Sequence, residues 1–215
     1  GLNAIYTSEE AGKINDLPNP EYAVFWDEVD GTFNWQKGGL IPSAAVIAAF
    51  EYKDVLRFKD VIFAGILDLK VGDLWHAQNG SGCFFNDNKV FSNGKTQLGE
   101  DVYLVIDHGP CPSRDSRANV ERFLDVYAST WPHNISCAGI HLAGVASGHF
   151  DAAVLPIQKA HELCAGYLLI READRYIADF HGLDLGNQEF DFNKLYEIVA
   201  ADTKELGERI LGKIR

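Results

Sequence analysis

Residues 24–35, VFWDEVDGTFNW, place two aspartates three positions apart, between an apolar run and a Gly-Thr turn. The segment 21–27 is β-branched and aromatic and follows the breaker run NDLPNP, which predicts a strand that ends at the aspartates. Two carboxylates this close cannot both stay ionised unless a cation or strong donors lie between them. A divalent ion held by Asp27, Asp30 and the backbone carbonyl of Val29 would satisfy that condition, and such oxygen ligands suit Mg²⁺.

The turn after the aspartates can be interpreted in two ways. Gly31 lets the backbone turn sharply, and the N–H groups of Gly31 and Thr32 would then form an anion-binding nest beside the cation. Cation and nest together predict a phosphate site. The same residues also fit an Asx turn, in which aspartates bond their own backbone and the glycine takes a positive φ. The motif alone leaves both interpretations open.

The flanking segments predict an α+β fold in two halves. Residues 43–91 form three strand-like segments that close on Gly, Asp or Asn, which indicates antiparallel hairpins. From about residue 101, strands alternate with helices. The helices are expected over residues 115–130, 137–148, 161–173 and 203–215. We interpret HGPCPSRD, residues 108–115, as a loop.

We therefore expect a layered α/β sandwich built as one compact unit. An antiparallel-sheet subdomain over 1–100 would carry the metal motif, and an α/β subdomain over 101–215 would pack against it. The cleft between the two is the natural ligand site.

Composition limits the class of protein. The 215 residues are 47% hydrophobic and 23% charged, which is typical of a globular protein, and the formal net charge of −12 disfavours nucleic acid as a partner. Apolar runs are too short for a membrane span and no basic-then-apolar leader opens the sequence, so we expect a cytoplasmic protein without membrane contact. The four cysteines, Cys83, Cys111, Cys137 and Cys164, form no CxxC pair and are expected to be reduced and buried.

Several segments together resemble one known family. WDEVDGTFNW is similar to the D-P-[IL]-D-G-T-x-N-F signature of the inositol monophosphatase superfamily, which are magnesium-dependent, lithium-sensitive phosphomonoesterases. TSEEAG, residues 7–12, resembles the G-E-E-[ST] segment of the family and makes Glu9 the matching metal carboxylate. Further segments resemble the family's hairpin, helix and strand patterns in the same order: residues 80–93, 137–156 and 161–182. The match covers almost the whole chain and implies the sandwich of inositol monophosphatase and fructose-1,6-bisphosphatase.

The resemblance implies hydrolysis of a small sugar or polyol phosphate, inositol-like in kind, by water activated on Mg²⁺. It implies two or three Mg²⁺ ions, with Mn²⁺ as a possible substitute and Li⁺ as an inhibitor, and a homodimer. The implied metal ligands are Glu9, Asp27, the Val29 carbonyl, Asp30 and Glu162. Glu9, Asp27 and Thr32 would be catalytic, with Thr32 positioning the attacking water, and the amides of Gly31 and Thr32 would bind the phosphate.

Departures from the family pattern support a second hypothesis. The Trp-Asp pair of the family is His161-Glu162 here, where His161 can be a ligand or a packed histidine, and Glu28 replaces a proline. The family's two long N-terminal helices carry an aspartate paired with the motif threonine, and the sequence given starts just before Glu9, so we expect Thr32 to lack that partner. The alternative is therefore a catalytically weak or inactive homologue that binds a ligand or a partner.

Overall fold

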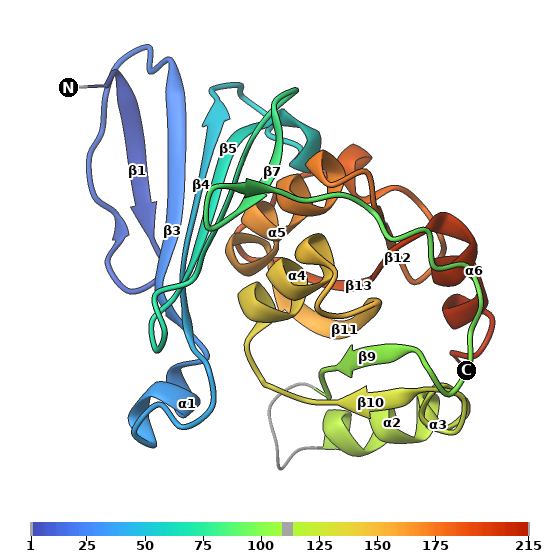
Figure 1. Ribbon diagram of the computed structural model, residues 1–215. Helices are drawn as coiled ribbons and strands as arrows, with labels where there is room; N and C mark the ends of the chain where they lie inside the picture. The colour runs from blue at the N-terminus through green and yellow to red at the C-terminus, as the bar shows by residue number, and fades with distance from the viewer. Residues whose placement is uncertain (1, 109–113, 215) are drawn as a thin grey trace.

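The computed structural model describes residues 2–108 and 114–214 and shows four stacked layers (Figure 1). An eight-stranded sheet is followed by helices α4 (Ala138–Ser147) and α5 (Ala160–Glu172). A five-stranded sheet lies on the other side of these helices, and the remaining long helices cover its far face. The α+β class predicted from the sequence is confirmed.

The eight-stranded sheet holds the N-terminal part of the chain. Its spatial order is β2-β1-β3-β4-β5-β6-β7-β8, and its pairs are antiparallel except for β1 with β3. The strands are β1 (Ala4–Ser8), β2 (Gly12–Lys13), β3 (Tyr22–Asp30), β4 (Ala44–Glu51), β5 (Val61–Asp68), β6 (Leu74–Gln78), β7 (Gly82–Phe85) and β8 (Asn88–Lys89). Two short helical segments accompany them: α1 (Thr32–Gln36) and η1 (Phe58–Asp60). Thus the predicted strand at 21–27 and the hairpins at 43–91 are present.

The five-stranded sheet is mixed, with the order β10-β9-β11-β13-β12. Its strands are β9 (Tyr103–Ile106), β10 (Trp131–His133), β11 (Ala152–Lys159), β12 (Tyr176–Asp179) and β13 (Leu195–Ala201). The helices on its far face are α2 (Arg114–Arg122), α3 (Leu124–Tyr127) and α6 (Lys204–Leu211), and a short helix, η2 (Leu185–Asn187), follows β12. Phe123, Val126, Leu206 and Ile210 are fully buried against this sheet in a core of their own.

The helices at 137–148 and 161–173 are confirmed by α4 and α5. The helix expected over 203–215 is present as α6 but ends at Leu211, and the single helix expected over 115–130 is wrong. The chain breaks at Phe123, whose φ of −100° and ψ of 5° leave the helical region, and a separate turn, α3, follows. The hydroxyls of Ser129 and Thr130 then donate to the carbonyls of Asp125 and Val126. Such bonds compete with helix propagation, which explains the early end.

The main core lies between the two sheets. Ala44, Val46, Ala48 and Phe50 of β4 face it, whereas Ile47 is 40% exposed, as expected for the period-2 alternation of a strand. Cys83, Cys137 and Cys164 are buried and free, as predicted. Cys111, and residues 109–113 of the predicted loop 108–115, lie outside the described residues.

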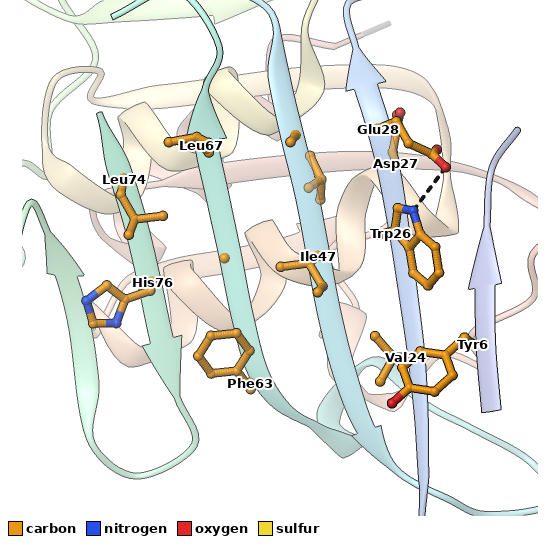
Figure 2. Close-up of a pocket in the computed structure, with 13 residues that line it drawn as sticks. Tyr6, Val24, Trp26, Asp27, Glu28, Ile47, Phe63, Leu67, Leu74 and His76 are labelled. Atoms are coloured by element: carbon orange, nitrogen blue, oxygen red, sulfur yellow. Dashed lines mark hydrogen bonds between the residues drawn. The ribbon is translucent and has the colours of Figure 1, made fainter. Parts of the chain in front are cut away.

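The other face of the eight-stranded sheet carries an open apolar hollow of about 800 Å³. Figure 2 shows Ile47, Phe63 and Leu74 standing on this face, on neighbouring strands. Trp26 and Glu28 lie at its edge, where Trp26 Nε1 donates to Glu28 Oε1 at 3.0 Å. Among the described residues, no helix has the length and apolarity of a membrane span.

Candidate metal centre

A bulge in β3 brings the two aspartates of the motif to one face. Asp27 pairs with Val46 and Asp30 pairs with Ala44, so two residues of β3 stand opposite one of β4. In a regular strand, positions three apart point to opposite faces. Because Val46 and Ala44 both face the core between the sheets, Asp27 and Asp30 do so as well, and they are 2% and 6% exposed.

Glu28 follows Asp27 in the strand and therefore points to the opposite face, the side of Trp26. Its carboxylate accepts hydrogen bonds from Ser8 Oγ at 2.5 Å and from Trp26 Nε1. The extra negative charge that replaces the family's proline is therefore outside the candidate site.

Parallel pairing of β1 with β3 places Glu9 beside Asp27. Ser8 is in register with Trp26, and the Glu9 N–H donates to the Trp26 carbonyl at 3.0 Å. The carboxyl ends of two parallel strands meet at one edge of a sheet. Glu9 and Asp27 therefore project from adjacent strands at the same level.

Helix α5 supplies two further side chains from its first turn. His161 is 1% exposed and its ring packs on Phe192, with a centroid distance of 4.7 Å. Glu162 Oε2 accepts the N–H of Lys159 at 2.7 Å, which satisfies a free amide at the helix start. The helix start thus fixes both side chains opposite the end of β3.

Helix α4 approaches Asp30 from the other side. Asp30 Oδ2 accepts the N–H of Gly139 at 2.5 Å and the thiol of Cys137 at 3.3 Å. A Cβ on Gly139 would stand 3.0 Å from Asp30 Oδ2 and 2.9 Å from Val46 Cγ2, so only glycine permits this approach. The carboxylate also benefits from the positive end of the helix dipole.

Together these elements form two overlapping clusters of potential ligands. Atoms of Glu9, Asp27 and His161 lie within 4.8 Å of one another, as do atoms of Asp27, Asp30 and Glu162. Asp27 belongs to both. All four carboxylates predicted from the sequence therefore converge, and their role as metal ligands remains a proposal.

Burial disfavours the charged forms of three of these acids. Burial, together with the charges of Glu9 and Asp30, raises the pKa of Asp27 to about 8. Burial and the charge of Asp30 raise the pKa of Glu162 to about 8. Burial also raises the pKa of Asp30, although the hydrogen bond from the Gly139 N–H lowers it in part. Among the described residues, no lysine or arginine forms an ion pair with Asp27, Asp30 or Glu162.

Glu9 is the exception, because it lies beside His161 and Lys159. The imidazole of His161, acting against burial and together with Lys159, lowers the pKa of Glu9 to about 2. Lys159 Nζ lies 2.5 Å from Glu9 Oε1. The sequence analysis missed Lys159, and its position directly before the His161-Glu162 pair at a helix start was the available signal.

The turn after β3 combines features of both interpretations of the motif. Asp27 Oδ1 accepts the N–H of Val29 at 2.8 Å, as the Asx-turn interpretation expects, and Gly31 has a φ of 78°. The Thr32 hydroxyl donates to the Val29 carbonyl at 2.9 Å. The turn geometry therefore coexists with the convergent carboxylates, and the roles of Gly31, Thr32 and the Val29 carbonyl remain proposals.

The donor set fits hard divalent cations. Carboxylate oxygens at this spacing are the ligands that Mg²⁺ takes in proteins. Asp27 is buried and Glu162 is half-buried, and neither forms an ion pair with a lysine or arginine in the described part of the chain; a divalent ion would offset their mutual repulsion.

Comparison with known proteins gives relatives named as phosphatases and relatives named as Nus factor SuhB. A fructose-1,6-bisphosphatase/inositol-1-monophosphatase of Archaeoglobus fulgidus is 27% identical over 202 residues, covering 92% of this chain and 70% of that protein. A bifunctional NADP phosphatase/NAD kinase of Methanococcus maripaludis is 26% identical over 227 residues, covering 98% of this chain and 38% of that protein. The chain thus spans only part of the length of these relatives.

Solved structures share the fold. A Pyrococcus horikoshii protein described as similar to inositol-1 monophosphatase matches with a TM-score of 0.79 and 24% identity, over 99% of this chain and 77% of that one. An inositol monophosphatase/NADP phosphatase in complex with Mg²⁺ and phosphate matches with a TM-score of 0.74 and 18% identity, over 97% and 72%. The model of the inositol monophosphatase family matches residues 3–215. This chain belongs to the inositol monophosphatase family.

Proposed function

We propose that this chain is a metal-dependent phosphomonoesterase that releases phosphate from a small phosphorylated sugar or polyol. The convergence of Glu9, Asp27, Asp30 and Glu162 at the end of β3 carries the proposal. Family membership and the phosphatase names of relatives support ester hydrolysis as the reaction class.

The carboxylates divide into two sets around Asp27. Glu9, Asp27 and the Val29 carbonyl would hold one Mg²⁺, and Asp27, Asp30 and Glu162 would hold a second. When bound, such ions lower the pKa of a coordinated water and offset charge on the phosphate. A third ion, replacement by Mn²⁺ and inhibition by Li⁺ remain predictions.

Thr32 would orient the attacking water. Its hydroxyl hydrogen is committed to the Val29 carbonyl, so the lone pairs of Oγ1 can accept a hydrogen bond from that water. The left-handed conformation of Gly31 turns the chain at this point. The amides of Gly31 and Thr32 would then hold the phosphate oxygens.

One observation favours the alternative of a weak or inactive homologue that binds a ligand or a partner. Lys159 already neutralises Glu9, so the first cluster has a positive partner of its own. Lys159 retains 47% exposure of its side chain, which leaves it free to move aside. The homodimer and the cytoplasmic location implied earlier also remain predictions.

Phosphate release from a panel of sugar and polyol phosphates, with Mg²⁺ and with EDTA, tests the proposal. We expect Mg²⁺-dependent release that Asp27→Asn abolishes. Asp87→Asn is the matched control, because Asp87 is 98% exposed on the far hairpin and should leave release unchanged. If no ester of the panel releases phosphate at any ratio of enzyme to Mg²⁺, the proposed hydrolysis is refuted and the alternative is favoured.

A further inference from the structure

His161 is a buried imidazole without a hydrogen-bond partner. Its side chain is 1% exposed, and neither Nδ1 nor Nε2 finds a partner among the described residues. Burying a polar group without a hydrogen-bond partner is unfavourable. Because this unpartnered imidazole lies beside a carboxylate cluster, we expect one of its nitrogens to bind a ligand, such as a metal ion, held by the same cluster.

The distances around the ring fit coordination better than hydrogen bonding. His161 Nε2 is 3.5 Å from Glu9 Oε1, beyond the usual 2.7–3.2 Å range of an N–H···O bond. Ligands on opposite sides of one ion, each about 2.0–2.2 Å from it, are separated by ~4 Å. Potential ligand atoms of Glu9, Asp27 and His161 lie within 4.8 Å of one another. A small movement of these side chains towards one another would let all three coordinate one ion.

Two consecutive residues of α5 belong to the two different ligand clusters that share Asp27. His161 joins Glu9 and Asp27, whereas Glu162 joins Asp27 and Asp30. The second set contains oxygen ligands alone, which suits Mg²⁺, whereas the first adds a nitrogen, and imidazole suits first-row transition ions. The two sets therefore differ in the metal chemistry that they favour.

We propose that His161 is a metal ligand, and that the Glu9–Asp27–His161 position is a mixed nitrogen-oxygen site for a divalent transition ion beside an oxygen-only position for Mg²⁺. The proposal rests on the proposed function, because both place metal ions around Asp27. Lys159 leaves Glu9 when the first position fills. A transition ion would then take the place of the Mg²⁺ assigned above to the Glu9–Asp27 position, and the second position would keep its Mg²⁺.

Electron spin echo spectroscopy of the full chain with bound Mn²⁺ tests this directly. The chain is first stripped with a chelator, and Mn²⁺ is added below one equivalent, with Mg²⁺ in excess to occupy the oxygen-only position. We expect modulation from a directly coordinated nitrogen nucleus. Bound Mn²⁺ without nitrogen coupling would overturn the proposal, and this measurement needs no variant that must fold.

Two variants then identify the nitrogen. His161→Phe keeps a ring against Phe192 and removes both nitrogens, so the coupling should vanish. Mn²⁺ should also bind at least ~10-fold more weakly, since loss of an outer-shell partner alone costs about 10–100-fold. His76→Phe is the control, because His76 lies on β6, three strands from β3, and should change neither quantity.

The outcomes separate this inference from the proposed function. Mg²⁺-dependent phosphate release without nitrogen coupling refutes the His161 ligand and leaves the phosphatase intact. Nitrogen coupling without release from any ester supports the mixed site and refutes the phosphatase. If His161→Phe retains the coupling, another nitrogen ligand is present and the assignment is wrong.

Discussion

The ammonium of Lys159 lies 2.5 Å from Glu9 Oε1, so a lysine and a metal ion compete for the same carboxylate. Lys159→Gln should therefore tighten Mg²⁺ binding. A solvent-exposed ion pair is worth about 0.2–1 kcal/mol, which limits the gain to ~5-fold. Titration calorimetry measures it, and Lys13→Gln, which breaks the exposed pair with Asp16, is the control. Weaker Mg²⁺ binding by the Lys159 variant would contradict the competition.

Glu162 belongs to one cluster only, unlike Asp27. Glu162→Gln should lower the number of bound divalent ions by one, while the Glu9–Asp27 set keeps its ion. The amide oxygen of the glutamine can still accept the Lys159 N–H, so the start of α5 should be preserved. Metal content after dialysis gives the stoichiometry. Glu205→Gln, in the first turn of α6, is the matched control, and an unchanged metal count in Glu162→Gln would exclude Glu162 as a ligand.

The metal-free protein should lose stability as the pH rises from about 4 to about 8. Asp27 and Glu162 have folded-state pKa values of about 8, whereas carboxyls of an unfolded chain titrate near 4. Between these values the folded state binds more protons than the unfolded state, so the free energy of unfolding falls with rising pH. Thermal melts in EDTA at pH 5 to 8 measure this.

Two additions sharpen the pH experiment. Asp27→Asn should flatten the decline, because it removes a charge that folding must bury, and Mg²⁺ should restore stability at pH 8. If the stability of the metal-free protein stays level or rises over this pH range, burial does not raise the pKa values of Asp27 and Glu162.

Gly31 combines two constraints that can be separated. Its φ is 78°, and a Cβ would meet Cys137 Cβ at 3.2 Å and the Ser136 carbonyl at 3.3 Å. Gly38 has a φ of 87° and open space around it. Gly38→Ala should cost about 1–2 kcal/mol from the left-handed conformation alone, and Gly31→Ala should cost more. Urea denaturation compares them, and equal costs would mean that the Cys137 contact gives way without penalty.

Two of the four carboxylates are predicted from a local signal, because Asp27, Asp30 and the Gly31 turn lie within one motif. Family resemblance added Glu162, at the start of a strongly apolar helix, and Glu9, which follows a strand, β1, that we had not predicted. The pairing of β1 with β3 joins Ala4 to Tyr22 in parallel, and such pairing leaves no hairpin signal in the sequence.

Other features depended on contacts far apart in the chain. Strand β10 was missed because Pro132 argues against a strand, and it is tolerated there because β10 is at the sheet edge. The Lys159–Glu9 contact spans 150 residues and has no local pattern. The bulge in β3 was not predicted either, because the order of polar and apolar residues does not show where an extra residue interrupts the alternation of a strand.

The bulge in β3 means that the pairing of β3 with β4 does not by itself decide which way the Asp30 side chain points. Glu28 and Val29 together face the single residue Ala45, and the ladder with β4 is regular before Asp27. Without the bulge, Asp30 would be an ordinary third position after Asp27 and would face outward, on the side that Glu28 occupies. The sheet would then keep its pairing partners while the centre lost a carboxylate, so a strand of the same composition could form the sheet and still lack the site.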